Sequence, residues 1–260
     1  MPNMAKPKKP APKAPDVYPM RINKYLAHKG LATRTGVDEL IKSNKILING
    51  VIAKLGDKVK ETDLVEVRGV HNKKYIYLAY NKSMGVVSTN PQGDEKSIMD
   101  NIKMSALPAD ATRPALQAGK VFPIGRLDKE SHGLIILTND GRVTDRLLSP
   151  DKNHEKEYLV KLDRKYTPGF VRNMQEGVNL TDGMTKPAKV EEVDDIRFKL
   201  TLTEGRNRQI RRMAEKLGFT VRDLQRIRIQ NIELDKLPLN SYREIKGDEK
   251  AEFLKSIGLE

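Results

Sequence analysis

A short polar connector, Gly69 to Lys74 (GVHNKK), divides this sequence into a small segment with helix and hairpin signals and a long segment rich in strand signals. The chain has 260 residues, more than the roughly 150 that one domain usually contains. Hydrophobic residues make up 38% of it, which is sufficient for a buried core. We find no internal repeat. We therefore expect two domains of unequal size, joined by a linker over residues 69–74.

The segment before the connector changes character at Met20. Residues 1–19 alternate Pro, Ala and Lys and contain few apolar side chains, so we predict a disordered Lys/Pro-rich tail. From 20 to 68 the apolar spacing predicts a compact unit of two short helices followed by strands. The second helix is expected over Thr35 to Ser43, with Asn44 in the left-handed conformation at its end.

The strands of this unit are expected over Ile46 to Ile48 and Leu64 to Val67. Between them lies Asn49-Gly50, a dipeptide typical of the two-residue turn of a hairpin. The pattern therefore predicts a hairpin around this turn, packed on the two helices.

Beyond the connector, residues 75–260 alternate strand and helix signals. The expected strands are Tyr75 to Tyr80, Gly133 to Thr138, Glu157 to Leu162, Phe198 to Thr203 and Arg226 to Leu234. Helices are expected to open at Asp140, Thr167 and Asn207. The stretch from Met104 to Lys120 lacks periodicity and is expected to be an irregular insertion. This order predicts an α+β domain on a mixed, mostly antiparallel sheet.

Charge restricts the class of partner. A formal net charge of +13 and a pI near 9.7 favour binding to a polyanion, because each Lys or Arg placed on a phosphate releases a counterion. A membrane surface is the rival partner, but no run approaches the roughly 18 apolar residues of a spanning helix, and the start of the chain lacks the apolar core of a signal peptide. We expect a cytoplasmic protein that binds nucleic acid and not a membrane.

The residue types available limit the chemistry. The sequence contains no cysteine, which excludes disulfides, a thiolate nucleophile and a Cys-based zinc site. The four histidines are scattered and lack the spacing of metal ligands. We therefore expect no metal and no cofactor. Any reaction must depend on carboxylates, hydroxyls, guanidinium groups or amines.

The segment 121–141 (VFPIGRLDKESHGLIILTNDG) places a charged cluster between two apolar strands, and active sites concentrate in such loops. Asp128 and Arg126 are its candidate functional residues. Taken alone, Asp128 would more often be a turn or cap residue, and Arg126 a surface charge.

Three motifs, in this order, resemble those of the pseudouridine synthases related to the small-subunit and large-subunit rRNA enzymes. Gly125-Arg126-Leu127-Asp128, with the apolar run that follows, is similar to their catalytic motif. Lys156-Glu157-Tyr158 is similar to their tyrosine motif, and residues 204–213 (EGRNRQIRRM) resemble their arginine motif. The segments RINKYLAHKGLATR and ILINGVIAKLGDKV are similar to the S4 domain, a small α/β unit that binds RNA. The resemblance implies a pseudouridine synthase fold over residues 75–260.

The resemblance also implies an activity and a role for each motif residue. The enzyme would isomerise a specific uridine in structured RNA to pseudouridine, with 23S rRNA as the expected target and tRNA as the second candidate. Asp128 would act as nucleophile or as the base that starts elimination at the sugar. Arg211 would pair with that aspartate, Tyr158 would stack on the base, and Arg126 would fill the place of the flipped nucleotide.

Further arginines and lysines are expected to contact RNA phosphates. These residues are Arg21, Lys24, Arg34 and Lys45 in the S4-like unit and Arg206, Arg208 and Arg212 in the arginine motif. The alternative for the last group is that they only coat a basic helix. The rival function is a catalytically silent RNA-binding ribosome assembly factor. We expect a monomer and predict no protein partner.

Overall fold

The computed structural model describes residues 18–28, 34–68, 75–104, 121–149 and 152–259. Contacts divide the chain into two compact units, Met1–Lys73 and Lys74–Glu260. The expected tail (except for residues 18 and 19), the 69–74 linker and most of the 104–120 insertion lie outside the described residues.

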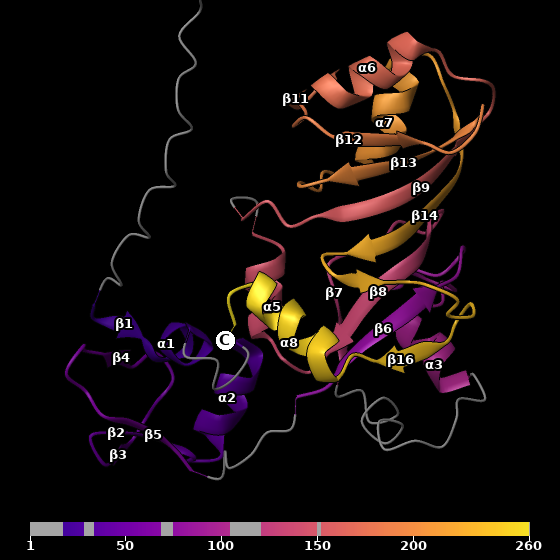
Figure 1. Ribbon diagram of the computed structural model, residues 1–260. Coiled ribbons are helices and arrows are strands. Elements are labelled where there is room, and N and C mark those ends of the chain that lie inside the picture. The colour runs from indigo at the N-terminus through magenta and orange to yellow at the C-terminus, as the bar shows by residue number, and fades with distance from the viewer. Residues whose placement is uncertain (1–17, 29–33, 69–74, 105–120, 150–151, 260) are drawn as a thin grey trace, which may run out of the picture. The chain divides into compact units, whose positions relative to one another are not determined.

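The first unit combines two helices with short strands (Figure 1). Its elements are β1 (Met20–Arg21), α1 (Ile22–His28), α2 (Arg34–Lys42), β2 (Ile46–Ile48), β3 (Val51–Ile52), β4 (Lys58–Val59) and β5 (Val65–Val67). β2 lies between β3 and β5 in a three-stranded antiparallel sheet, and β1 pairs with β4. Ile22, Leu26, Val37, Ile46 and Val59 are almost completely buried and form its core.

The Asn49-Gly50 turn forms, with both residues at positive φ (51° and 79°). It joins β2 to β3, however, and not to the strand expected over residues 64–67. A two-residue turn can only connect strands that are immediate neighbours in sequence, so the hairpin partner is Val51–Ile52. The later segment pairs with the other edge of β2 as β5. Asn44 ends the second helix at a φ of 55°, as the sequence predicted.

The second unit is built on a nine-stranded sheet. Its strands are β6 (Tyr77–Lys82), β7 (Phe122–Ile124), β8 (His132–Thr138), β9 (Lys156–Leu162), β12 (Lys189–Glu192), β13 (Arg197–Leu202), β14 (Val221–Ile229), β15 (Ile232–Glu233) and β16 (Tyr242–Glu244). The main path runs β12-β13-β9-β14-β8-β6-β16, while β15 pairs with β14 and β7 with β8. Only the β14–β8 pairing is parallel among the described strands. The α+β class with a mixed, mostly antiparallel sheet is confirmed.

Helices cover the sheet in separate groups (Figure 1). α6 (Pro168–Glu176) and α7 (Gln209–Lys216) pack on the part formed by β9, β13 and β14. The β6–β8 part is covered on both sides, because successive residues of these strands face opposite cores. One core includes α5 (Arg142–Leu147) and α8 (Gly247–Ser256), and the other includes α3 (Ile98–Met104). β10 (Asn179–Leu180) and β11 (Gly183–Met184) form a separate hairpin.

Several element predictions need correction. The segment from Arg226 to Leu234, expected to be one strand, is divided in the structure. It contains the end of β14, a tight turn at residues 230–231 and the short hairpin partner β15. Asn207 does not cap α7. Its N-cap is Arg208, which has a left-handed backbone. Thr167 caps α6 as expected, accepting a hydrogen bond from the amide of Phe170.

Gly133 permits the one parallel contact in the sheet. It has a φ of +107° and pairs with Arg226 of β14. A Cβ at this position would lie 2.3 Å from the Arg226 carbonyl oxygen and 2.8 Å from its amide nitrogen. Two backbones therefore approach each other so closely that only glycine fits. This contact places the start of β8 against the middle of β14.

Gly133→Ala should destabilise the second unit strongly, with Gly183→Ala as the matched control. Both glycines have φ near +100°, but a Cβ at Gly183 would meet nothing within 4 Å. In the control, the free energy of unfolding should therefore fall only by the cost of placing alanine at a positive φ, about 1–3 kcal/mol. Gly133→Ala should lose clearly more in the free energy of unfolding, measured by urea denaturation. Equal losses would show that the close approach of the two strands is not needed.

Candidate active site

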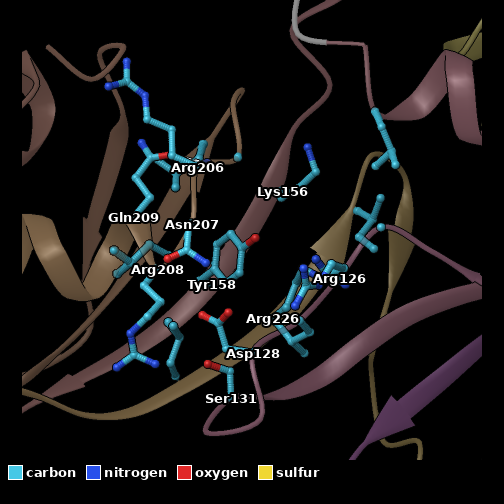
Figure 2. A pocket seen from close by; sticks show the side chains of 18 of the residues that line it. Arg126, Asp128, Ser131, Lys156, Tyr158, Arg206, Asn207, Arg208, Gln209 and Arg226 are labelled. Atoms are coloured by element: carbon cyan, nitrogen blue, oxygen red, sulfur yellow. Dashed lines mark hydrogen bonds between the residues drawn. The ribbon is translucent and has the colours of Figure 1, made fainter. Parts of the chain in front are cut away.

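The cavity that contains Asp128 lies where the loop before β8 meets β9 and β14 (Figure 2). Its volume is about 420 Å³. Its walls come from residues 124–128 and Ser131 of the loop, from β9 and β14, from Leu147 and Leu148, from Leu202 at the end of β13, and from residues 205–210 at the start of α7. Asp128 is half-buried, and Tyr158 lines the same cavity near it.

The loop that carries Asp128 is held by its backbone. Each carbonyl from Leu127 to Ser131 accepts a hydrogen bond of 2.8 to 3.0 Å. The donors, in order, are the Ser88 hydroxyl, the Ser131 amide, the Gly85 amide, the Arg211 guanidinium and the Lys82 ammonium. Buried polar groups that are satisfied in this way give a loop a single conformation. The Asp128 side chain therefore projects from a fixed backbone.

Two of these donors come from the end of β6 and the segment after it: Lys82 is the last residue of β6, and Ser88 follows six residues later. The Ser88 hydroxyl both donates to the Leu127 carbonyl (2.9 Å) and accepts from the Leu127 amide (3.0 Å). Lys82 is completely buried, and its ammonium donates to the carbonyls of Ser131 (2.8 Å) and Ser83 (3.0 Å). Burial lowers the pKa of Lys82 to about 8, while the negative charge of nearby Asp128 acts in the opposite direction. Lys82 is therefore a buried cation near Asp128, and it bonds to the backbone of the loop that carries this residue.

The family resemblance implied that Arg211 pairs with the Asp128 carboxylate, but the structure does not show this contact. Among the described residues, no hydrogen bond or ion pair joins the two side chains. The Arg211 guanidinium instead donates to the carbonyls of Glu130 (2.9 Å) and Val221 (3.0 Å). It lies on α7, so it connects this helix to the backbone of the loop. These hydrogen bonds of Arg211 stabilise the position of the loop relative to α7.

Strand β9 supplies Tyr158 and Lys156 to the same wall. Residues two apart on a strand point to one side, so both side chains line the cavity (Figure 2). Arg226 of β14 lies on an adjacent wall, and the β14 residue paired with Tyr158 is Arg226 itself. Arg126 also lines the cavity but is exposed. The structure thus brings Arg126, Asp128 and Tyr158 to one cavity.

The three arginines that were predicted to bind RNA differ in their contacts. Arg212 forms a two-pronged ion pair with Asp182 at 2.9 and 3.1 Å. Arg206 donates to the Gly183 carbonyl at 2.8 Å and pairs with Glu204 at 3.4 Å. Both therefore tie the β10–β11 hairpin to the start of α7. Arg208 is more exposed, lines the cavity and pairs with Glu130 at 2.8 Å. RNA contact remains a prediction for all three.

In the first unit, Arg21, Lys24 and Lys45 are exposed. None of the three side chains forms an ion pair with another residue that the structure describes. The side chain of Arg34 lies outside the described part of the chain. Their role in gripping RNA phosphates stays a prediction.

Three cations of the site were not found from the sequence: Lys82, Lys156 and Arg226. The spacing of Lys156 and Tyr158 on a predicted strand was a usable signal, because it places both on one face. Lys82 and Arg226 gave no such signal. Each lies in a strand where the sequence alone does not show which face is buried, and only the fold shows that it is buried near Asp128.

The described residues contain no cluster of three or more His, Asp or Glu side chains suited to hold a metal ion. Within the same residues, no helix combines the length and the apolar character needed to cross a membrane.

Two family models match the sequence. Residues 76–216 match the RNA pseudouridylate synthase family, and residues 20–65 match the S4 domain. The first match covers the loop of Asp128, the strand of Tyr158 and helix α7.

Individual proteins agree with these models. The chain is 38% identical over 243 residues to the dual-specificity RNA pseudouridine synthase RluF of Escherichia coli (strain K12), covering 92% of this chain and 79% of that protein. It is 33% identical to the ribosomal large subunit pseudouridine synthase B of Bacillus subtilis (strain 168), covering 88% and 93%. A crystal structure of a pseudouridylate synthase resembles it with a TM-score of 0.64 and 31% identity, covering 91% of this chain and 99% of that one.

Ser88→Ala should slow catalysis without weakening RNA binding. The substitution removes both hydrogen bonds to Leu127. A displacement of the loop by less than 1 Å is enough to lower kcat by about 10- to 100-fold. RNA affinity should change less than two-fold, because the hydroxyl of the buried Ser88 bonds to the backbone of Leu127. Ser256→Ala, which removes a similar bond to the Phe253 carbonyl in α8, is the control. Normal kcat in Ser88→Ala would contradict the anchoring of the loop.

Glu130→Gln should strengthen RNA binding. Glu130 now pairs with Arg208, so its neutralisation frees this arginine for a phosphate. The expected gain in affinity is about two- to five-fold, the range of an exposed ion pair. The control is Glu191→Gln, which breaks the exposed ion pair with Lys199 at 3.0 Å. It removes the same charge at a residue that does not line the cavity, so RNA affinity should change little. Equal changes in both variants would reflect net charge alone.

Proposed function

Because the chain belongs to the RNA pseudouridylate synthase family, we propose that Asp128 is the carboxylate with which it converts uridine in RNA to pseudouridine. The chain is an RNA pseudouridine synthase that carries an S4 domain before its catalytic domain, and RNA is its substrate. We assign the S4-like domain to residues 20–68 and the catalytic domain to residues 75–260.

The reaction rearranges one nucleotide. The bond from ribose C1′ to uracil N1 breaks, the uracil turns, and C1′ joins C5, which gives up its proton to N1 through the solvent or a protein group. No atoms are gained or lost and nothing is oxidised, so an ionised carboxylate is sufficient to start it. Asp128 acts as nucleophile or as the base that removes a ribose proton. The observation that carries this assignment is its place: Asp128 is the only carboxylate on the wall of the cavity, among the described residues.

The cavity also fits a base that has left its stack. Tyr158 offers an aromatic face near Asp128 in the same cavity, so a uracil that lies against the ring would have its sugar toward the carboxylate. Arg126 is exposed at the rim, where it can occupy the gap that the flipped nucleotide leaves. Flipping costs a few kcal/mol less for an unpaired nucleotide, which favours a loop or bulge as target.

The target within the cell is a finer proposal. The E. coli relative is called a dual-specificity enzyme, and the B. subtilis relative a large ribosomal subunit enzyme. We propose 23S rRNA as the main substrate, with tRNA as the second. An enzyme of these substrates acts in the cytoplasm, and we propose that it works as a monomer.

Asp128→Asn should abolish pseudouridine formation while leaving RNA binding intact. The amide has the shape of the carboxylate but cannot ionise, so kcat should fall by roughly 10²- to 10⁴-fold or more. The measurement is pseudouridine mapping of unmodified rRNA, ribosomal particles and tRNA after incubation with each protein, together with RNA affinity. Asp145→Asn, which alters a carboxylate of α5 whose side chain does not line the cavity, is the control.

A pseudouridine that the wild type forms and Asp128→Asn does not form would support the assignment and identify the target. If both proteins form it equally, Asp128 is not the catalytic carboxylate. If neither modifies any of the RNAs and both bind them tightly, the protein acts as the silent ribosome assembly factor instead.

A further inference from the structure

The active-site cavity contains more positive charge than its carboxylate can offset. Its described walls carry five cationic side chains and one carboxylate, Asp128; the cations are Arg126, Lys156, Arg206, Arg208 and Arg226. Arg206 and Arg208 have carboxylate partners outside the cavity, Glu204 and Glu130. Arg126 is exposed to solvent. The buried ammonium of Lys82 lies near Asp128 and is influenced by its charge, and no ion pair joins Asp128 to Lys156 or Arg226 among the described residues. Lys156 and Arg226 are therefore left without a counterion among the described residues.

Arg226 keeps an unused donor. Its side chain is 3% exposed, and its Nε donates to the Leu134 carbonyl at 2.6 Å. Its Nη2 is buried and has no hydrogen-bond partner among the described residues. A buried guanidinium nitrogen without an acceptor costs free energy, because its hydration has been lost and nothing replaces it. Such an atom on the wall of a binding cavity indicates an acceptor that arrives with the ligand.

Lys156 is in a similar position. Its ammonium makes one long hydrogen bond, 3.4 Å to the carbonyl of His154, and its side chain points into the cavity beside Tyr158 (Figure 2). Burial, followed by the charge of nearby Arg226, lowers the pKa of Lys156 to about 8. Two neighbouring cations thus repel each other, and neither forms an ion pair with a carboxylate among the described residues.

We propose that Lys156 and Arg226 form an anion subsite that binds a phosphodiester group of the RNA next to the flipped uridine. This inference rests on the proposed function, because it assumes that the uridine enters this cavity. The phosphate is the anion that a nucleotide brings with it. Three features favour this ligand: donors that still lack acceptors, an excess of positive charge, and a place on the same strand face as the tyrosine that receives the base. The phosphate would fix the sugar while the uracil turns.

The subsite has a consequence for the protein without RNA. The pKa of an unfolded lysine is about 10.4, so the lowered value means that the folded chain holds the Lys156 charge at a cost at pH 7. Lys156→Met removes this cost and fills the wall with an apolar chain. It should therefore raise the free energy of unfolding while it weakens RNA binding. A lysine with only a structural role would change both in the same direction.

The decisive test is a double-mutant cycle between protein and RNA. The probe is a synthetic RNA with the mapped target uridine, in which the linkage on its 5′ or its 3′ side is replaced by an uncharged methylphosphonate. The proteins are the wild type, Lys156→Met, Lys156→Arg and the control Lys161→Met. Lys161 is an exposed residue of β9 on the opposite face. Affinity and kcat/KM are both measured.

For the wild type and Lys161→Met, one of the two neutral linkages should lower affinity or kcat/KM about ten-fold, since hydrogen bonds between charged groups contribute on this scale. For Lys156→Met the same linkage should change either value clearly less, about two- to three-fold, because only Arg226 is left to bind the phosphate, and Lys156→Arg should restore the full sensitivity. The slope of log affinity against log salt should also fall by roughly 0.7–0.9 in Lys156→Met, as expected for one lost phosphate contact.

Equal sensitivity of the wild type and Lys156→Met at both linkages would overturn the subsite. This outcome is separate from failure of the proposed function. If Asp128→Asn remained active while the cycle showed coupling, the phosphate subsite would stand and the assignment of Asp128 would fall. If Asp128→Asn were inactive and no coupling appeared, the reverse would hold.

Discussion

Hydrogen bonds to the backbone of the Asp128 loop connect the separate parts of the catalytic domain to its chemistry. Lys82 at the end of β6, Ser88 beyond it and Arg211 on α7 each donate to a carbonyl between Leu127 and Ser131. These donors come from segments far apart in the sequence, so the loop takes its conformation only when the sheet and α7 have assembled. A carboxylate on such a loop needs no reorganisation when the substrate arrives, which is the condition for efficient catalysis.

The charges of the site follow from the same arrangement. Lys82 is buried where it holds the loop near Asp128. Arg226 is buried and Lys156 is half-buried, and neither has a carboxylate partner among the described residues. A protein that keeps uncompensated cations in its interior gives up stability, and this is common where a ligand supplies the missing charge. The proposed phosphate subsite would thus make RNA the component that completes the electrostatics of the domain.

The sequence predicted the sheet class, the approximate positions of several main strands and the candidate residues Asp128, Tyr158 and Arg126, because apolar periodicity and local motifs are both readable along the chain. It did not predict α3 or α8, whose apolar residues are few and are stabilised by tertiary packing. Arg211 was expected to pair with the carboxylate, but it bonds to the backbone of the loop. Which atom a long side chain reaches depends on tertiary contacts. The same reason hid Lys82 and Arg226, whose burial appears only when β6, β8 and β14 are side by side.

A structure of the Asp128→Asn protein bound to an RNA stem-loop with its mapped target uridine would test the central claim most directly. The account predicts that the uridine is flipped into the cavity with its base against Tyr158 and its ribose facing residue 128. It also predicts that a phosphate lies within hydrogen-bond distance of Lys156 and Arg226. A target nucleotide that remains stacked, or that binds outside this cavity and leaves the substituted side chain at position 128 without contact, would contradict the assignment of Asp128.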